Sequence, residues 1–227
     1  MTILKRLAAP KLWKTPRKKK KFIVSPRPGA HLKEYSIPLG IILRDYLKVA
    51  ETLGEAKKIL TSKIVKVNDH IRTDYKFSVG FMDVLEVGNK AYRVVPTSHG
   101  LELKEIKDKD IKLSKVLNKT TVKGGKIQLN LHEGWNLLYD SKDIKTGDVL
   151  VIDLKTKKIK DVLKFEEGSL ALITGGSNIG KIGKIEKIKI IRSPRPNMVV
   201  LSVNGAKVAV PSHYVFVVGK DKPVIEL

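Results

Sequence analysis

Residues 39–50 read LGIILRDYLKVA, and their apolar positions recur with the period of an α-helix. One continuous apolar face is formed by residues spaced three and four apart: Leu39, Ile42, Leu43, Tyr46, Leu47 and Ala50. Thr52 then occupies the position of a helix N-cap, and Glu55, three residues later, completes a capping box. The stretch therefore predicts two consecutive helices, the second of which buries Ala56, Ile59 and Leu60.

A small sheet is predicted directly after these helices. Residues 64–67 have a strand pattern, Asn68-Asp69 suits a tight turn with positive φ, and residues 70–74 return as the hairpin partner. Residues 81–87 supply a further strand after Gly80. We therefore expect a compact unit of two helices and a hairpin sheet.

The chain downstream of residue 90 is expected to be mostly β. Strand-like stretches alternate with glycine-containing turns and lie at 92–95, 127–131 and 149–154. The highly charged stretch 102–117 is predicted as a short helix or a loop. A second β unit begins at Gly168, and within it Asn204-Gly205 joins 198–203 to 206–210 as a hairpin. Short strands at this spacing favour a small barrel over a sandwich.

The segment upstream of the helices is strongly basic. Residues 1–33 hold 11 Lys and Arg and no Asp or Glu, and the whole chain has a net charge of +22. Such a segment is expected to stay extended unless a polyanion neutralises it. Clustered cations gain affinity for nucleic acid by releasing phosphate counterions, although a solvated tail or a targeting signal is the alternative. Trp13 and Phe22 can either stack on bases or anchor the segment to the body.

Other classes of function are disfavoured by what the sequence lacks. Without cysteine there are no disulfides, cysteine zinc sites or thiol nucleophiles. The apolar stretches are far shorter than the ~20 residues of a membrane-spanning helix. Residues 175–181 have the spacing GxxxxGK of a phosphate loop, but Ile182 stands where that loop needs Ser or Thr. His132-Glu133 begins a zinc motif whose second histidine is replaced by Asn136.

The remaining titratable residues do not suggest catalysis either. The histidines lack metal-ligand spacing and are interpreted as surface or hairpin residues: His31, His70, His99, His132 and His213. The adjacent Glu166 and Glu167 would diverge on a strand, which disfavours a paired-carboxylate site. We expect no enzymatic activity, cofactor, metal or small-molecule substrate.

Four stretches resemble known families. Residues 4–13, LKRLAAPKLW, resemble the N-terminal signature of the e-type small-subunit ribosomal protein four family of archaea and eukaryotes, and 124–132, GGKIQLNLH, resemble its central region. Four short segments together resemble an S-four-type RNA-binding module: LRDYL at 43–47, EAKK at 55–58, VKVND at 65–69 and FMDV at 81–84. Residues 168–185, which include TGGSNIGKIG at 174–183, are similar to the KOW motif.

The resemblance implies a structural protein of the small ribosomal subunit in the cytoplasm, which binds ribosomal RNA and neighbouring ribosomal proteins. The expected fold is α+β with several domains. These are a basic extension (1–37), the two-helix and hairpin RNA-binding module (38–88), a mainly β central domain (89–167) and an SH3-like KOW barrel with a C-terminal strand (168–227).

Candidate RNA contacts follow from charge and from position in these motifs. The extension contributes Lys5, Arg6, Lys11, Trp13, Lys14, Arg17, Lys18, Lys19, Lys20, Lys21 and Arg27. By position in the module, the helices contribute Arg44, Lys48, Lys57 and Lys58, although residues 38–88 have a net charge of only +1 (eight basic, seven acidic). In the KOW region, Gly180 and Gly183 would let the backbone approach a phosphate, and the counter-charge would come from Lys181, Lys184, Arg192 and Arg195.

The same residues also fit other interpretations. The two KOW-region glycines also fit a plain barrel turn. A factor in ribosome assembly or transcription can carry the same modules, and so can an RNA-modifying enzyme. The enzyme is disfavoured because it needs a catalytic domain of ~150 residues or more, and residues 90–167 offer neither that space nor a plausible acid, base or nucleophile.

Overall fold

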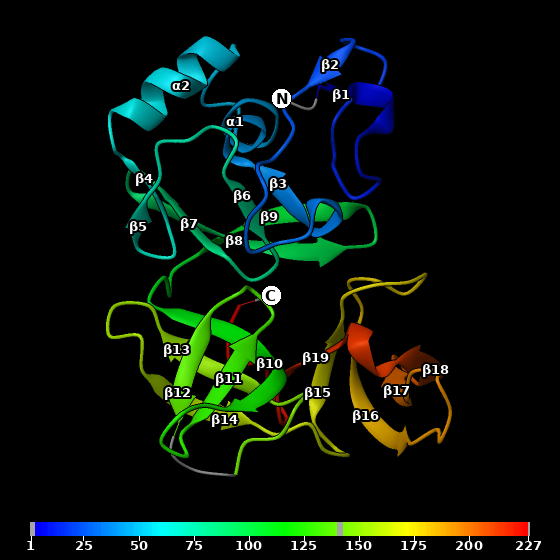
Figure 1. The fold of residues 1–227 in the computed structure, drawn as a ribbon. Helices are drawn as coiled ribbons and strands as arrows, with labels where there is room; N and C mark the ends of the chain where they lie inside the picture. Colours follow the sequence, from blue (N-terminus) through cyan, green and yellow to red (C-terminus); the bar gives the residue numbers. More distant parts are fainter. Residues whose placement is uncertain (1–2, 140–142, 227) are drawn as a thin grey trace. The chain divides into compact units, whose positions relative to one another are not determined.

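The computed structural model describes residues 3–139 and 143–226, and the chain divides into two compact units, Met1–Lys109 and Asp110–Leu227 (Figure 1). The fold is α+β and mostly β. The helical elements are short and comprise η1 (Arg6–Ala8), η2 (Lys33–Tyr35), α1 (Leu39–Ile41), η3 (Ile42–Tyr46), α2 (Leu53–Thr61) and η4 (Ser212–Tyr214). None of the helices in the described ranges is long and apolar enough to cross a membrane.

The first unit is built on antiparallel strands. A five-stranded sheet has the order β5-β4-β7-β8-β9, with β5 (His70–Ile71), β4 (Val65–Val67), β7 (Val84–Val87), β8 (Lys90–Thr97) and β9 (Gly100–Ile106). Two small sheets pair β1 (Leu4–Lys5) with β2 (Phe22–Ile23) and β3 (Ser36–Pro38) with β6 (Ser78–Gly80). The predicted turn between β4 and β5 is confirmed, since Asn68 and Asp69 have φ of 51° and 62° and Val67 pairs with His70.

The helical stretch that opens the module is shorter than predicted. After α1 the backbone widens into the π-helical turn η3, in which the Leu47 amide donates to the Ile42 carbonyl over 2.9 Å. The helix ends there because Lys48 is left-handed, with φ of 54°, and the next two amides return to the Leu43 carbonyl. Lys48 therefore lies beyond the end of the helical stretch, which corrects the prediction that a helix carries it.

The second predicted helix is confirmed as α2. The Thr52 side chain accepts a hydrogen bond of 3.2 Å from the Glu55 amide, and the Glu55 carboxylate accepts from the Thr52 hydroxyl and the Glu51 amide. These hydrogen bonds, that from the Glu51 amide first, lower the pKa of Glu55. The capping box fixes where α2 begins, while Ala56 and Leu60 lie in the core.

The N-terminal segment is folded onto the first unit and does not remain extended, so that expectation is wrong. Five of its apolar side chains lie in the same core as α1 and β4: Leu4, Ala9, Trp13, Ile23 and Val24. The Arg17 guanidinium donates to the carbonyls of Leu7, Ala9 and Pro10 over 3.0–3.1 Å. The Leu101 amide donates to the Leu12 carbonyl over 2.8 Å. Apolar burial and backbone hydrogen bonds thus hold this basic segment in place.

The second unit contains two five-stranded antiparallel sheets. The first has the order β12-β11-β10-β13-β14, with β12 (Asn136–Tyr139), β11 (Ile127–Leu131), β10 (Ile111–Thr121), β13 (Val149–Asp153) and β14 (Ile159–Leu163). The second has the order β18-β17-β16-β15-β19, with β18 (Ala206–Pro211), β17 (Met198–Val203), β16 (Ile182–Lys189), β15 (Leu170–Ile173) and β19 (Val215–Gly219). The β17–β18 hairpin is confirmed, since Asn204 and Gly205 form its turn with φ of 49° and 83°.

The charged stretch 102–117 is neither a helix nor a loop. It supplies most of β9 and the first half of β10. Its charged residues alternate with apolar ones that face buried neighbours, as where Leu103 pairs with Val94 and Leu113 with Val151. The partner strands impose the extended conformation, which local charge density does not reveal.

Candidate nucleic-acid interface

Two of the predicted RNA contacts lie inside the protein. Arg6 is only 3% exposed, and its guanidinium donates to the Pro16 carbonyl over 2.9 Å. Trp13 is also 3% exposed, and its indole nitrogen donates to the Ser36 carbonyl over 2.7 Å. A buried indole cannot stack on a base, so Trp13 anchors the segment, and Arg6 and Trp13 are corrected from RNA contacts to structural residues.

A second group of predicted cations is engaged by partners within the first unit. Lys14 forms an ion pair with Glu102, whose pKa is lowered by this hydrogen bond. Arg17 holds the three carbonyls described above. Arg27 lies 3.0 Å from Asp74, and Arg44 makes a bidentate pair with Asp45 over 2.8 Å. The adjacent carboxylate raises the pKa of Arg44. These residues hold the fold together with part of their hydrogen-bonding capacity.

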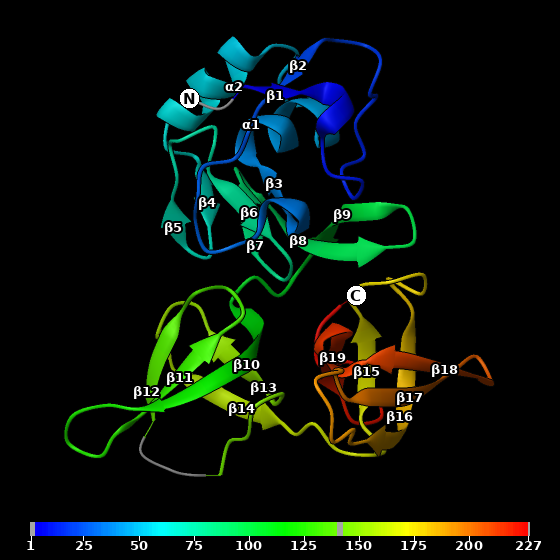
Figure 2. The same cartoon turned by 45° about the vertical axis from the view of Figure 1, so that its right-hand side comes forward.

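The last group of predicted cations in the first unit is free. These side chains are exposed and make no ion pair with any described residue: Lys5, Lys11, Lys18, Lys19, Lys20, Lys21, Lys48, Lys57 and Lys58. Two of them lie over aromatic rings, Lys21 at 5.4 Å from Phe22 and Lys57 at 4.5 Å from Tyr75. Figures 1 and 2 place β2 and α2 at the same upper end of this unit, opposite the β8–β9 hairpin. The lysine run preceding β2 and the lysines of α2 therefore come from elements at one end.

The predicted glycine site in the second unit lies in strand β16 and in the turn before it. A side chain at Gly183 would place its Cβ 2.6 Å from the Ser202 carbonyl oxygen and 2.7 Å from a Val203 methyl group. This space is filled by strand β17, so Gly183 serves sheet packing and not the approach of a phosphate. Gly180 lies in a turn with φ of 82°, and its amide donates to Ile173 over 2.8 Å. Both glycines thus match the structural alternative.

The cations of the C-terminal sheet also separate into paired and free groups. Lys181 donates to the Asn178 side chain over 2.8 Å, and Lys184 lies 3.4 Å from Asp221. Arg192 and Arg195 are exposed in the loop after β16 and form no ion pair with described residues. Of the four cations predicted in this region, Arg192 and Arg195 are therefore unpaired, whereas Lys181 and Lys184 already have partners within the protein.

The sequence interpretation missed further exposed cations, among them two that lie close to the predicted loop arginines. Lys187 and Lys189 project from β16 and have no ion-pair partner among the described residues. A bulge between Ile185 and Lys187 shifts the strand register, after which these two lysines share the outward face. The sequence KIKIIRSPR at 187–195 could have revealed these two lysines, because it places four cations close together.

Two histidines interpreted as surface residues also need correction. His31 Nε2 lies 2.7 Å from the Asp83 carboxylate, which also accepts hydrogen bonds from the Gly80 amide and the Asn68 side chain. His132 accepts from the Lys115 amide over 3.1 Å and packs edge-on against Phe216. Both imidazoles stabilise strand ends. Within the described residues no three His, Cys, Asp or Glu side chains form a metal-binding group.

Comparison with known proteins adds independent information. A model of the ribosomal family S4e matches residues 88–159, and a model of the RS4NT (NUC023) domain matches residues 3–34. The chain is 46% identical to the small ribosomal subunit protein eS4 of Archaeoglobus fulgidus, with 98% of this chain and 97% of that protein covered. It is 47% identical to the eS4 protein of Methanosphaera stadtmanae, with 99% and 95% covered.

A solved structure is similar as well. The crystal structure of the 30S ribosomal protein S4e from Thermoplasma acidophilum superimposes with a TM-score of 0.73 at 34% identity. The similarity covers 83% of this chain and 97% of that one.

Proposed function

The chain belongs to the ribosomal S4e family, and from this premise we propose that its free lysines and arginines bind ribosomal RNA and so fix the protein within the small subunit. As a member of this family it is a structural constituent of the small ribosomal subunit. Its role is to bind and to scaffold, without a catalytic step. The ribosome places it in the cytoplasm, beside ribosomal RNA and other ribosomal proteins.

The proposal rests on the division of the predicted cations into buried, paired and free groups. The exposed, unpaired group in the first unit includes the whole run at 18–21, which lies on a segment anchored by Trp13. A cation held on a fixed scaffold loses less conformational freedom on binding than one on an extended tail. Phosphate contacts from such cations set position and orientation on folded RNA without reading its sequence.

We further propose which parts of the chain present these cations. Residues 38–88 act as an S-four-type RNA-binding module, extended by β8 and β9 in the same sheet, and α2 offers Lys57 and Lys58. Residues 168–227 act as a KOW-type, SH3-like barrel whose free cations include Lys187, Lys189, Arg192 and Arg195. The extension, 1–37, and the central strands, 89–167, complete the arrangement.

The test is incorporation into small subunits. The tagged full-length chain is expressed in cells of its source, and subunits are separated on a gradient after a high-salt wash. We expect the unmodified chain to stay with the small subunit, and a variant with Lys18, Lys19, Lys20 and Lys21 replaced by Gln to be reduced. Replacing the exposed Lys123, Lys126, Lys157 and Lys158 by Gln removes the same charge and serves as the control. Loss of the unmodified chain to the free fraction would contradict the proposal.

A further inference from the structure

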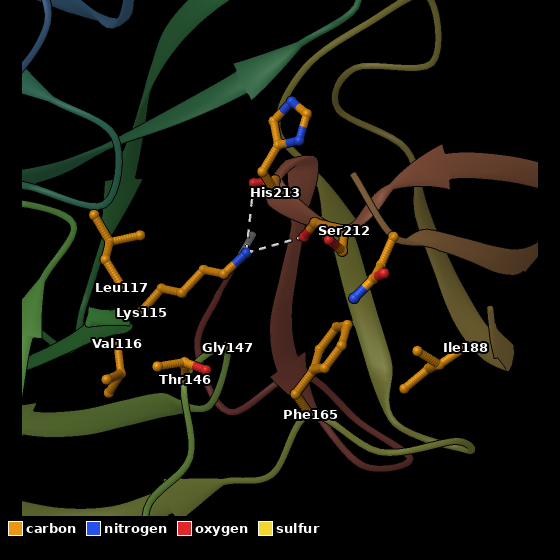
Figure 3. A pocket seen from close by; sticks show the side chains of 10 residues that line it. Lys115, Val116, Leu117, Thr146, Gly147, Phe165, Ile188, Ser212 and His213 are labelled. Carbon is orange, nitrogen blue, oxygen red and sulfur yellow. Dashed lines mark hydrogen bonds between the residues drawn. The ribbon is translucent and has the colours of Figure 1, made fainter. Parts of the chain in front are cut away.

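The second unit contains a cavity of about 300 Å³ that none of the contacts above uses (Figure 3). Its walls come from β10, from the turn before β13, from Phe165 in the linker after β14, and from β16, the loop before β17 and η4. In Figure 3 the Phe165 side chain stands between Ile188 on one side and Thr146 and Gly147 on the other. A volume of this size is at the lower end of the range for small-ligand sites, about 300–1,000 Å³.

An aromatic ring supported from behind is the main feature of this cavity. A Cβ at residue 147 would lie 3.5 Å from the Phe165 ring, so the ring packs directly against the Gly147 backbone. The Phe165 amide donates to the Asp148 carboxylate over 2.9 Å, which fixes the backbone that carries the ring. Leu117 and Ile188 add apolar surface to the lining. Such a lining suits a flat aromatic ligand.

Lys115 holds the walls together and does not offer its charge to a ligand. Its ammonium group donates to the carbonyls of Ser212, His213 and Val215 over 3.2, 3.4 and 2.6 Å. These bonds tie β10 to η4 and to the start of β19, so the opposite sides of the cavity are fixed to each other. Other polar groups remain in the lining, notably the Asn197 amide nitrogen and the Thr146 hydroxyl, which make no hydrogen bond with described residues.

The loop next to the cavity carries two cations, and the Glu167 carboxylate, which accepts from the Ile188 amide over 3.1 Å, is the acidic group on the other side of Ile188. Ile188 and Asn197 both line the cavity, and the loop between them carries Arg192 and Arg195. The Asn197 side chain accepts a hydrogen bond of 2.9 Å from the Ile191 amide, which closes this loop at its base. A phosphate bound by these arginines would lie beside a cavity that contains an aromatic ring. That combination matches one nucleotide, with its phosphate outside and its base within.

We propose that this cavity takes up one unpaired nucleobase of RNA, stacked on Phe165, while the loop arginines hold the adjacent phosphates. The inference rests on the proposed function and deepens it. The proposed function assigns phosphate contacts to the cations, and this inference adds a contact between Phe165 and a base. The two arginines of the adjacent loop favour a nucleotide over an apolar side chain of another protein, because such a side chain carries no charge for the arginines to bind.

The test uses intact small subunits that contain the full-length chain. They are irradiated with short-wave ultraviolet light, and the tryptic peptide 165–181, which begins with Phe165, is examined for an attached nucleotide. We expect a cross-link there that is lost in Phe165→Ala and retained in Phe165→Trp. The affinity of the full chain for small-subunit RNA is expected to fall about 5- to 100-fold in Phe165→Ala, and Phe165→Trp should restore it. Leu138→Ala, an exposed apolar residue outside the cavity, is the matched control.

The possible outcomes separate the two proposals. Subunits that contain the chain but give no nucleotide on 165–181, with unchanged affinity in Phe165→Ala, would overturn the base pocket and leave the proposed function standing. A peptide of another ribosomal protein cross-linked at this cavity would also overturn it. Absence of the chain from the subunits would refute both. Melting curves of each variant show whether the compared proteins are folded.

Discussion

The indole nitrogen of Trp13 and the carbonyl oxygen of Ser36 are joined by a buried hydrogen bond of 2.7 Å. This bond ties the basic N-terminal segment to the first residue of β3, while the indole ring lies in the core of the first unit. The lysines of 18–21 are therefore presented by a folded part of the protein. We expect both stability and RNA binding to depend on this anchor and to respond differently to substitution.

Replacing Trp13 by Ala is expected to lower the free energy of unfolding of the first unit by about 3–5 kcal/mol, because a large buried ring is lost. Trp13→Phe keeps most of the apolar contact but leaves the Ser36 carbonyl unpaired, at a cost of about 1–3 kcal/mol. Denaturant unfolding followed by circular dichroism measures both. The variant with Lys18, Lys19, Lys20 and Lys21 changed to Gln is the control and should unfold as the unmodified protein does. Equal stability of Trp13→Ala and the unmodified protein would disprove the anchoring role.

The four lysines should instead determine the salt dependence of RNA binding. Each phosphate contact contributes about 0.7–0.9 to the slope of log affinity against log salt. Replacing Lys18, Lys19, Lys20 and Lys21 by Gln is therefore expected to reduce the slope by roughly 3 units. Filter binding over a salt series measures this change. An equal reduction in the variant of Lys123, Lys126, Lys157 and Lys158 would mean that total charge, and not this run, sets the slope.

Gly183→Ala is expected to lower stability more than RNA affinity. The added Cβ meets the Ser202 backbone at 2.6 Å, and a strand backbone cannot move away as a flexible side chain can, so we expect a loss of about 3 kcal/mol or more. Gly176→Ala is the control: its φ of 84° costs about 1–2 kcal/mol, but no atom lies within 4 Å of the new Cβ. Calorimetry beside RNA titrations at a temperature where both variants are folded measures the two effects. Weakened RNA binding by folded Gly183→Ala would restore the phosphate-approach role of this glycine.

Burial lowers the pKa of Lys115 to about 8, from an ordinary value of 10.5. The unfolded chain keeps this proton up to higher pH than the folded one, so the group destabilises the fold below pH 8, and this effect is relieved as the pH rises towards 10.5. Relative to Lys115→Met, the unmodified protein should gain up to about 3 kcal/mol of stability over that interval. Urea unfolding at a series of pH values measures the difference.

The control for this pH dependence is Lys123→Met, which removes an exposed charge. Between pH 8 and 10.5, Lys123→Met should gain as much stability as the unmodified protein does, whereas Lys115→Met should lack this gain. Parallel stability curves for Lys115→Met and the unmodified protein between pH 8 and 10.5 would show that the proton on Lys115 is not linked to folding.

Local signals in the sequence predicted local structure well. The Thr52–Glu55 capping box and the turns at Asn68-Asp69 and Asn204-Gly205 are set by neighbours within a few residues, and the structure confirms all three. The prediction of a helix or a loop over 102–117 was wrong because the strands there are imposed by pairing with β8 and β13, which lie elsewhere in the sequence.

The sequence predicted which types of residue the candidate site contains, but not which of these side chains are accessible. Whether a cation is free depends on a partner at a distance along the chain, such as Glu102 for Lys14 or Asp74 for Arg27. Arg6 has the same local sequence signal as Lys5, yet only the first is buried. The bulge in β16 that turns Lys187 and Lys189 outward likewise depends on the pairing with β17.

The hydrogen bond between the Leu101 amide and the Leu12 carbonyl also sets an order of events during synthesis. Residue 12 leaves the peptidyl-transferase centre long before residue 101 has been added, and at about 5–20 residues per second the interval is roughly 4–18 seconds. Throughout that time the lysines of 18–21 belong to a nascent chain whose anchor has no complete docking surface. The basic run is thus exposed to polyanions before the first unit closes, so a partner that binds it during translation would meet an unfolded segment, and one that binds it afterwards would meet a folded surface.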